Sequence, residues 1–152
     1  MIDARLKELK IDLPAPMPPA ANYVPFVKTG SVLSVSGQLP LLKGELHYKG
    51  KVGRELSLEE GQEAARLCGL QIIAQVKEAC GGDLNRVHRC LRLGGFVNST
   101  EDFTDQHKVI NGASDLMLAV FGEKGKHVRL AVGVAALPLN AAVEIEALFE
   151  VA

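Results

Sequence analysis

The chain has 152 residues, a length that fits one domain. Hydrophobic residues make up 47% and charged residues 23%, as in an ordinary soluble globular protein. Seventeen basic residues against eighteen acidic ones leave a net charge of −1, so no nucleic-acid partner is expected. The longest apolar run, residues 130–139, is shorter than the roughly 20 residues that cross a bilayer, and the N-terminus lacks an apolar signal core. We therefore expect a cytoplasmic protein with no membrane partner.

The three cysteines are Cys68, Cys80 and Cys90, an odd number without a CxxC pair. None of the four histidines lies at zinc-ligand spacing to them. Cys68 and Cys80 fall in an apolar helical pattern, where buried free thiols are common. The sequence therefore predicts free thiols and no metal site.

At the N-terminus, residues 1–11 predict a short amphipathic helix that turns Leu6 and Leu9 inward. The next stretch, residues 13–20, contains four prolines, which remove backbone donors and fix φ. We expect it to run extended over the surface. The chain thus divides into an N-terminal lead-in, residues 1–20, and a single domain, residues 21–152.

The domain opens with two predicted strands, at residues 23–28 and 31–39. A two-residue turn between them ends at Gly30, since glycine tolerates positive φ. This register pairs residues whose numbers sum to 59 and places Tyr23 opposite Ser36. Such a pair offers a ring and a hydroxyl to a small planar ligand, although an ordinary half-buried pair is the simpler alternative.

The later elements alternate between strands and helices. A capping box, Ser57 to Glu60, starts a helix that Gly81 and Gly82 end. The predicted elements are a short strand within 45–49, this helix, a strand at 87–97, a helix at 105–121, and strands at 128–137 and 142–151.

This order favours an α+β fold, one mixed sheet with two helices packed on a single face. The uncovered face would carry Val32, Ser34 and Ser36 or their neighbours. Other subunits would bury such a face, so we expect an oligomer.

The strand at 128–137 carries the main candidate for ligand binding. Its valines share one face, and the other face presents Arg129 among Ala131, Gly133 and Ala135. One long cation among very small side chains can line a cleft for a small anion, because a guanidinium matches a carboxylate with two hydrogen bonds. A salt-bridged or solvated strand arginine is the simpler alternative.

On the last strand, odd-numbered residues face the core and Glu144 and Glu146 face solvent. If residues 138–140 made a simple hairpin, Arg129 would lie opposite Phe149, roughly 16 Å along the strand from Glu144. A site that uses Arg129 and Glu144 would then have to cross a subunit boundary, unless the turn is no simple hairpin.

Three stretches of the sequence resemble the Rid family, also called the YjgF-like proteins. They are SGQLP at 36–40, GGFVNSTEDF at 94–103 and VRLAVGVAALPLNAAVEIEA at 128–147. With ANYVPFVKTG at 21–30 and the helix at 57–82, the resemblance covers about residues 20–152. It implies a chorismate-mutase-like fold and a homotrimer with ligand sites between subunits, and no cofactor or metal. Active members of the family hydrolyse enamines and imines, notably 2-aminoacrylate, to 2-keto acids and ammonia.

The resemblance also implies roles for individual residues. Arg129 matches the arginine that clamps the substrate carboxylate, and Glu144 matches the glutamate proposed to position or activate water. Main-chain groups around Ala131 would complete the contacts to the imine. Ala131 stands where the type member has a cysteine and Gly133 replaces a larger residue, which would enlarge the cleft. The other matched cleft residues are Tyr23, Ser36 and Asn111.

Three functions follow as expectations. The first is a hydrolase like 2-iminobutanoate/2-iminopropanoate deaminase, and the second is a non-catalytic trimeric binding protein for small carboxylates such as 2-keto acids. The third is a ribonuclease or translation inhibitor, an activity ascribed to some relatives. Near-neutral charge, two tyrosines and no tryptophan argue against the third.

Overall fold

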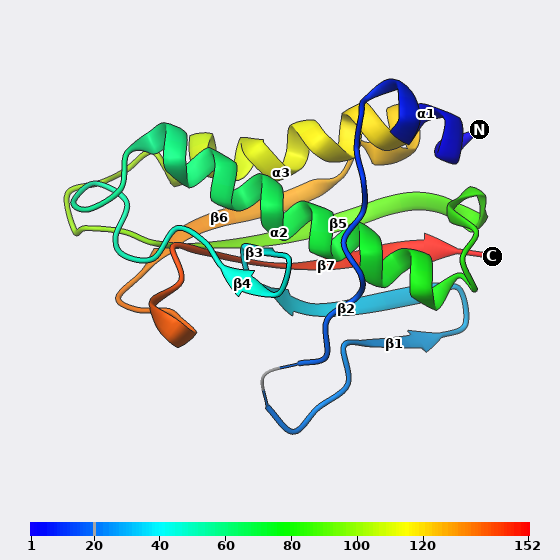
Figure 1. Cartoon of the computed structure of the whole chain (residues 1–152), viewed down its shortest axis with the longest axis horizontal. Helices are drawn as coiled ribbons and strands as arrows, with labels where there is room; N and C mark the ends of the chain where they lie inside the picture. The colour runs from blue at the N-terminus through cyan, green and yellow to red at the C-terminus, as the bar shows by residue number, and fades with distance from the viewer. Residues whose placement is uncertain (20) are drawn as a thin grey trace.

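A five-stranded mixed sheet, in the order β1-β2-β7-β5-β6, forms the centre of the molecule (Figure 1). The computed structural model describes residues 1–19 and 21–152, so Ala20, the last residue of the predicted lead-in, lies outside the described residues. β6 runs parallel to β5 and the other neighbours are antiparallel. The strands are β1 (Phe26–Thr29), β2 (Val32–Gln38), β5 (Val87–Asn98), β6 (Val128–Val134) and β7 (Val143–Val151).

Two long helices, α2 (Leu58–Ala79) and α3 (Gln106–Phe121), lie side by side on one face of the sheet (Figure 1). The predicted capping box is present, with Ser57 and Glu60 each accepting a hydrogen bond from the other's backbone N–H. The helices approach closely at Gly112, where a Cβ would lie 2.0 Å from the carbonyl oxygen of Gln62. The α+β prediction with two helices on one face is confirmed.

The N-terminal segment packs on this framework. Helix α1 (Ile2–Glu8) buries Leu6 in the core, and Leu9 packs against it, so both predicted inward positions are confirmed. Residues 12–19 then cross the molecule without regular secondary structure, as the blue segment of Figure 1 shows. Among the described residues, none of the helices combines the length and apolar character required to cross a membrane.

The first hairpin differs in register from the prediction. Paired residues sum to 61, with Phe26 opposite Val35, because the loop is Gly30-Ser31 and Gly30 takes φ +60° at its first position. The predicted pairing of Tyr23 with Ser36 is therefore wrong.

The ladder of this hairpin ends near Pro25, which has no N–H to donate, although its carbonyl still accepts from the Ser36 N–H at 2.9 Å. β2 continues past Gly37 to Gln38, with an irregularity in its pairing to β7 between Val35 and Gln38. The end of β2 at Gln38 thus lies within one residue of the predicted end at residue 39.

The later strands show three further features that the sequence did not establish. A separate two-stranded hairpin, β3 (Leu41–Leu42) and β4 (Glu45–Leu46), replaces the predicted strand at 45–49. β6 and β7 form no simple hairpin, because β5 lies between them. β6 stops at Val134, which pairs with Asn98, the last residue of its partner β5, and so it is shorter than predicted.

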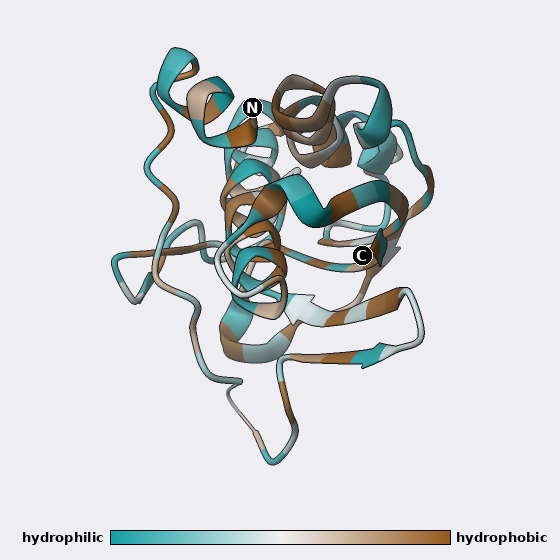
Figure 2. Cartoon of the chain, turned by 90° about the vertical axis from the view of Figure 1, so that its right-hand side faces the viewer, coloured by the Kyte–Doolittle hydropathy of each residue, from teal (hydrophilic) through white to brown (hydrophobic). Residues whose placement is uncertain are grey.

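The two faces of the sheet differ in burial. Odd-numbered residues of β7 are buried, as predicted, and face the helices. On the open face, Val32, Leu130 and Val132 are 42%, 36% and 42% exposed, and Ser34 is exposed too. Figure 2 shows hydrophobic and more hydrophilic residues alternating along the strands. The expected uncovered face carrying Val32 and Ser34 is confirmed, and the valine face of β6 belongs to it.

Candidate functional site

Three of the predicted site residues, Tyr23, Ser36 and Glu144, line one hollow of about 220 Å³. Ser36 comes from the irregular end of β2, Glu144 from the start of β7, and Tyr23 from the segment before β1. The corrected register removes the direct pairing of Tyr23 and Ser36, but the fold still brings both to this place. The other lining residues are Met17, Pro18, Pro19, Pro25, Gly37, Gln38, Leu39, Leu41, Pro138 and Leu139.

The carboxylate of Glu144 lies directly against the backbone of Gly37. A Cβ on Gly37 would sit 2.1 Å from Glu144 Oε2, so only glycine leaves room for this carboxylate. Burial, and secondarily the charge of Glu146, raise the pKa of Glu144 above its ordinary value. No described residue donates a hydrogen bond to Glu144, whereas Glu146 pairs with Arg92 at 3.0 Å. Glu144 is thus a partly desolvated carboxylate that is free to bind a water or a ligand donor.

The remaining polar groups of this hollow are held differently. Gln38 Nε2 donates to the Ser36 carbonyl oxygen at 3.1 Å and lies 3.5 Å from Ser36 Oγ. Tyr23 is 50% exposed, and its hydroxyl has no hydrogen-bond partner within the part of the chain that the structure describes. A ring, two hydroxyls and a carboxylate therefore surround one small space.

Arg129 lies in a second hollow, of about 310 Å³, which Asn111 also lines. Its Nη1 donates to Ser114 Oγ at 3.0 Å, and its Nη2 donates to the His107 carbonyl oxygen at 2.8 Å. A guanidinium has five N–H donors, so three stay available for a ligand. The structure thus holds the side chain of Arg129 against α3 with most of its binding capacity free.

A chain of hydrogen bonds extends behind Arg129. Ser114 Oγ lies 2.9 Å from His127 Nε2, and His127 Nδ1 lies 2.6 Å from the Gly125 carbonyl oxygen. A carbonyl only accepts, so in the neutral imidazole Nδ1 carries the proton and Nε2 accepts from the Ser114 hydroxyl. Ser114 in turn accepts from Arg129, and each member of the chain orients the next.

The two hollows lie apart in one chain. Arg129 pairs with Leu93 on the helix-covered face, whereas Glu144 pairs with Phe96 and lies on the open face. Three residue steps, roughly 10 Å, separate their levels along the sheet, and β5 lies between their strands. Residues 138–140 make no simple hairpin, and still a single chain does not bring Arg129 and Glu144 to one small ligand.

Two predicted features of the cleft lie elsewhere. Ala131 packs partly buried against the core and lines neither hollow. A Cβ on Gly133 would lie 2.7 Å from Ser99 Oγ and 2.8 Å from Gln106 Nε2. Gly133 instead lines a separate hollow, of about 410 Å³, together with Ser99 and Gln106, and lies in neither the hollow of Arg129 nor that of Glu144.

Sequence reasoning missed three residues that shape these hollows. Gly37 had a signal, because a glycine inside a strand marks a close approach of other groups, here Glu144. Ser114 and His127 had none, since their partnership with Arg129 arises only when α3 packs beside β6.

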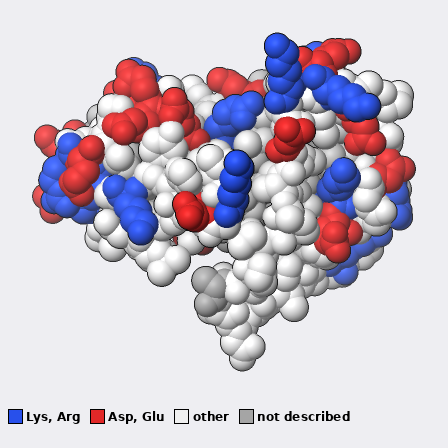
Figure 3. Space-filling view, viewed as in Figure 1, with Lys and Arg blue, Asp and Glu red and all other residues white. Residues whose placement is uncertain are grey.

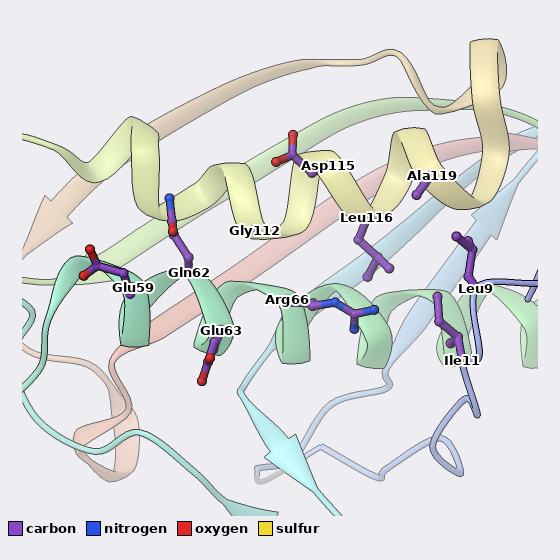
Figure 4. A pocket seen from close by; sticks show the side chains of 10 residues that line it. All are labelled: Leu9, Ile11, Glu59, Gln62, Glu63, Arg66, Gly112, Asp115, Leu116 and Ala119. Atoms are coloured by element: carbon purple, nitrogen blue, oxygen red, sulfur yellow. The ribbon is translucent and has the colours of Figure 1, made fainter.

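Another hollow, of about 450 Å³, lies between α2 and α3 and contains no predicted site residue (Figure 4). Its lining includes Glu59, Glu63 and Asp115, but the Glu63 and Asp115 side chains extend to opposite sides of the helix pair in Figure 4, and Glu63 accepts from the hydroxyl of Tyr48. Within residues 1–19 and 21–152, no group of three or more His, Cys, Asp or Glu side chains gathers as a metal ion would require.

Known proteins match this chain over nearly its whole length. A family model described as "YjgF/chorismate mutase-like, putative endoribonuclease" matches residues 3–151. Protein TCP17 of Trypanosoma cruzi is 52% identical over 98% of this chain and 93% of its own length. The crystal structure of Atu1372 from Agrobacterium tumefaciens, of unknown function, is 50% identical and has a TM-score of 0.93, covering 99% of this chain and 92% of that one.

A RidA from the Antarctic bacterium Psychrobacter is more distant. It is 28% identical with a TM-score of 0.62, and the match covers 90% of this chain and 94% of that one. These values fit a divergent branch relative to RidA. On the match of nearly the whole chain to the family model, this protein belongs to the YjgF/chorismate mutase-like family.

Proposed function

We propose that this protein hydrolyses reactive enamines and imines of the 2-aminoacrylate class to 2-keto acids and ammonia, in sites completed between the chains of a homotrimer. The observation that supports this most is the division of the site into two complementary halves. Arg129 offers a guanidinium with free donors, and Glu144 offers a partly desolvated carboxylate without a donor. The similarity of the chain to a RidA also supports the proposed function.

The role of Arg129 is to bind and orient the substrate. Its three free N–H donors can hold a carboxylate with two parallel hydrogen bonds, while Ser114 and the His107 carbonyl fix the guanidinium. Once the carboxylate is fixed, the adjacent C=N carbon has a defined position. Such orientation lowers the barrier by avoiding the entropy loss of a random encounter.

The role of Glu144 is to activate the attacking water. Its carboxylate accepts a proton as the water oxygen bonds to the C=N carbon, and the π electrons of C=N move to nitrogen. The proton then passes to the nitrogen of the tetrahedral carbinolamine. The hydroxyl proton of the carbinolamine then also passes to this nitrogen, the C–N bond breaks, ammonia leaves, and the carbonyl of the 2-keto acid forms. The raised pKa of Glu144 suits this exchange, because a base works best when its pKa approaches the working pH.

The sheet supports the proposed arrangement of chains. β6, with Arg129, is one edge strand, and β1 is the other, beside β2 and Ser36. A cyclic homotrimer would set the β6 edge of one chain near the hollow of Tyr23, Ser36 and Glu144 of the next. It would also bury the exposed apolar side chains of the open face.

The experiment compares ammonia and 2-keto acid release from 2-aminoacrylate, generated in situ, for the wild type, Arg129→Ala and no protein. We expect acceleration by the wild type and its loss in the variant, with the assembly intact by light scattering. Acceleration that persists in Arg129→Ala would refute the role of this residue. If the protein binds a 2-keto acid saturably and through Arg129 but does not accelerate the reaction, the result would refute the deaminase function. It would support the alternative of a non-catalytic protein that binds small carboxylates.

The surface gives no support to ribonuclease activity. Basic and acidic side chains are interspersed over the face seen in Figure 3, and the net charge is −1. RNA binding draws most of its affinity from phosphate contacts made by clustered basic residues.

A further inference from the structure

A further hollow, of about 520 Å³, lies under the N-terminal segment, away from Arg129. We call residues 12–19 the strap. Figure 1 shows the strap crossing α2 beside the β3–β4 hairpin. The strap, the hairpin and α2 form its walls. The volume of the hollow is in the range of small-molecule sites. The lining residues are Asp12, Leu13, Pro14, Ala15, Met17, Leu41, Leu42, Lys43, Gly44, Leu67, Leu70 and Gln71.

Two buried glutamines, one turn apart on α2, hold the walls in place. Gln75 Nε2 donates to the Met17 carbonyl oxygen at 2.8 Å and ties down the strap. Gln71 Nε2 donates to the Leu41 carbonyl oxygen at 3.1 Å and ties down the hairpin. Both glutamines are 1% exposed.

The second amide atom of Gln71 is left without a partner. The Leu41 carbonyl can only accept, so the nitrogen must face it and Oε1 is the remaining atom. Gln71 Oε1 is buried and accepts no hydrogen bond within the described chain. A buried acceptor without a donor is costly and uncommon in folded proteins. Its place in the wall of a hollow therefore points to a ligand that donates.

The strap can admit such a ligand. In the described part of the chain, the main chain of the strap makes a single hydrogen bond, the one from Gln75 to Met17. Its four prolines fix φ, so the segment keeps its extended shape when it lifts. Segments with few hydrogen bonds open at low free energy, so movement of the strap can admit a ligand to the hollow that Gln71 lines.

We propose that this hollow binds a small, neutral, mainly apolar molecule that donates one hydrogen bond, from an N–H or O–H, to Gln71 Oε1. The walls are leucine, methionine and proline side chains, and the charged members, Asp12 and Lys43, are exposed. A charged ligand would lose hydration here without a buried counter-charge. The site shares Met17 and Leu41 with the hollow of Glu144 but requires neither Arg129 nor the deaminase reaction.

The test uses indole, which has one N–H donor, and 1-methylindole, which has none, in titrations of the full-length protein followed by the NMR signals of the ligand. We expect indole to saturate one site per chain and to bind at least tenfold tighter than 1-methylindole, equivalent to about 1.4 kcal/mol. No saturable binding of indole, or equal affinity for both compounds, would overturn the proposal.

Variants separate the acceptor from the shape of the hollow. Gln71→Met should abolish the preference for indole. Gln75→Met removes the hydrogen bond to the Met17 carbonyl but keeps Gln71 Oε1, so this variant should retain the preference. Leu67→Trp should fill the hollow and weaken the binding of both compounds at least tenfold. If Leu67→Trp does not fold, Leu70→Phe takes its place as the variant that fills the hollow. A preference that survives Gln71→Met, or binding unchanged by filling the hollow, would contradict the assignment.

Discussion

Replacing Gly37 by alanine tests how tightly the backbone of β2 positions Glu144. The new Cβ would lie 2.1 Å from Glu144 Oε2, whereas Cβ contacts in proteins stay above about 3 Å, so the carboxylate must move by about 1 Å. A displacement of this size at a reacting group costs about 10²-fold in rate, or about 2.7 kcal/mol of transition-state stabilisation. Because the obstacle is the end of a flexible side chain, we expect a loss of only about 1 kcal/mol in stability.

The assay is kcat/KM for 2-aminoacrylate hydrolysis, together with the pKa of Glu144 from carboxyl NMR. Burial is the main cause of the raised pKa, so outward displacement should bring it back toward the ordinary value. Gly94→Ala is the matched control, because its Cβ would lie 2.9 Å from Glu146 and leave Glu144 in place. A folded Gly37→Ala variant with wild-type kcat/KM and an unchanged Glu144 pKa would refute the reasoning.

Three further predictions concern Ser114, Glu144 and the open face. Ser114→Ala removes the acceptor of Arg129 Nη1, so KM should rise about tenfold with kcat less affected, and stability should fall by about 1 kcal/mol; unchanged KM would argue against the positioning of Arg129. The raised pKa of Glu144 means that the folded state binds its proton more tightly than the unfolded chain, so its contribution to stability falls as the pH rises from the ordinary 4.5 through the raised value. Glu144→Gln should therefore have a higher Tm than the wild type at pH 7, a gain that shrinks below pH 4.5, and a pH-independent difference would contradict this. Leu130→Asp places a charge on the open face and should yield monomers by light scattering without deaminase activity; an intact, active trimer would exclude that face from the interface.

Local signals in the sequence predicted most of the fold. The capping box at Ser57, the alternation of β7 and the positive φ at Gly30 each depend on a few neighbouring residues. The errors arose where pairing between distant segments decides the outcome. The hairpin register depended on whether Gly30 takes the first or second loop position, and the insertion of β5 beside β7 has no local signature.

The candidate site was predictable only in part, for the same reason. Arg129 stood out as a long cation among small residues, and its resemblance to a family motif gave it a role. Its partners Ser114 and His127 come from other elements and are visible only after α3 packs beside β6. The sequence could not show that Gly133 lies beside Ser99 and Gln106 in a separate hollow, because these residues are far from it along the chain.

The central claim, that Arg129 of one chain and Glu144 of another complete each site, is tested most directly by mixing two inactive variants. Arg129→Ala and Glu144→Gln would be unfolded together, refolded at equal amounts and assayed with 2-aminoacrylate. In randomly assembled trimers, about one quarter of the sites would combine an intact arginine with an intact glutamate, so about a quarter of the wild-type activity should return. A mixture as inactive as its two components, despite hybrid trimers shown by native mass spectrometry, would contradict the account.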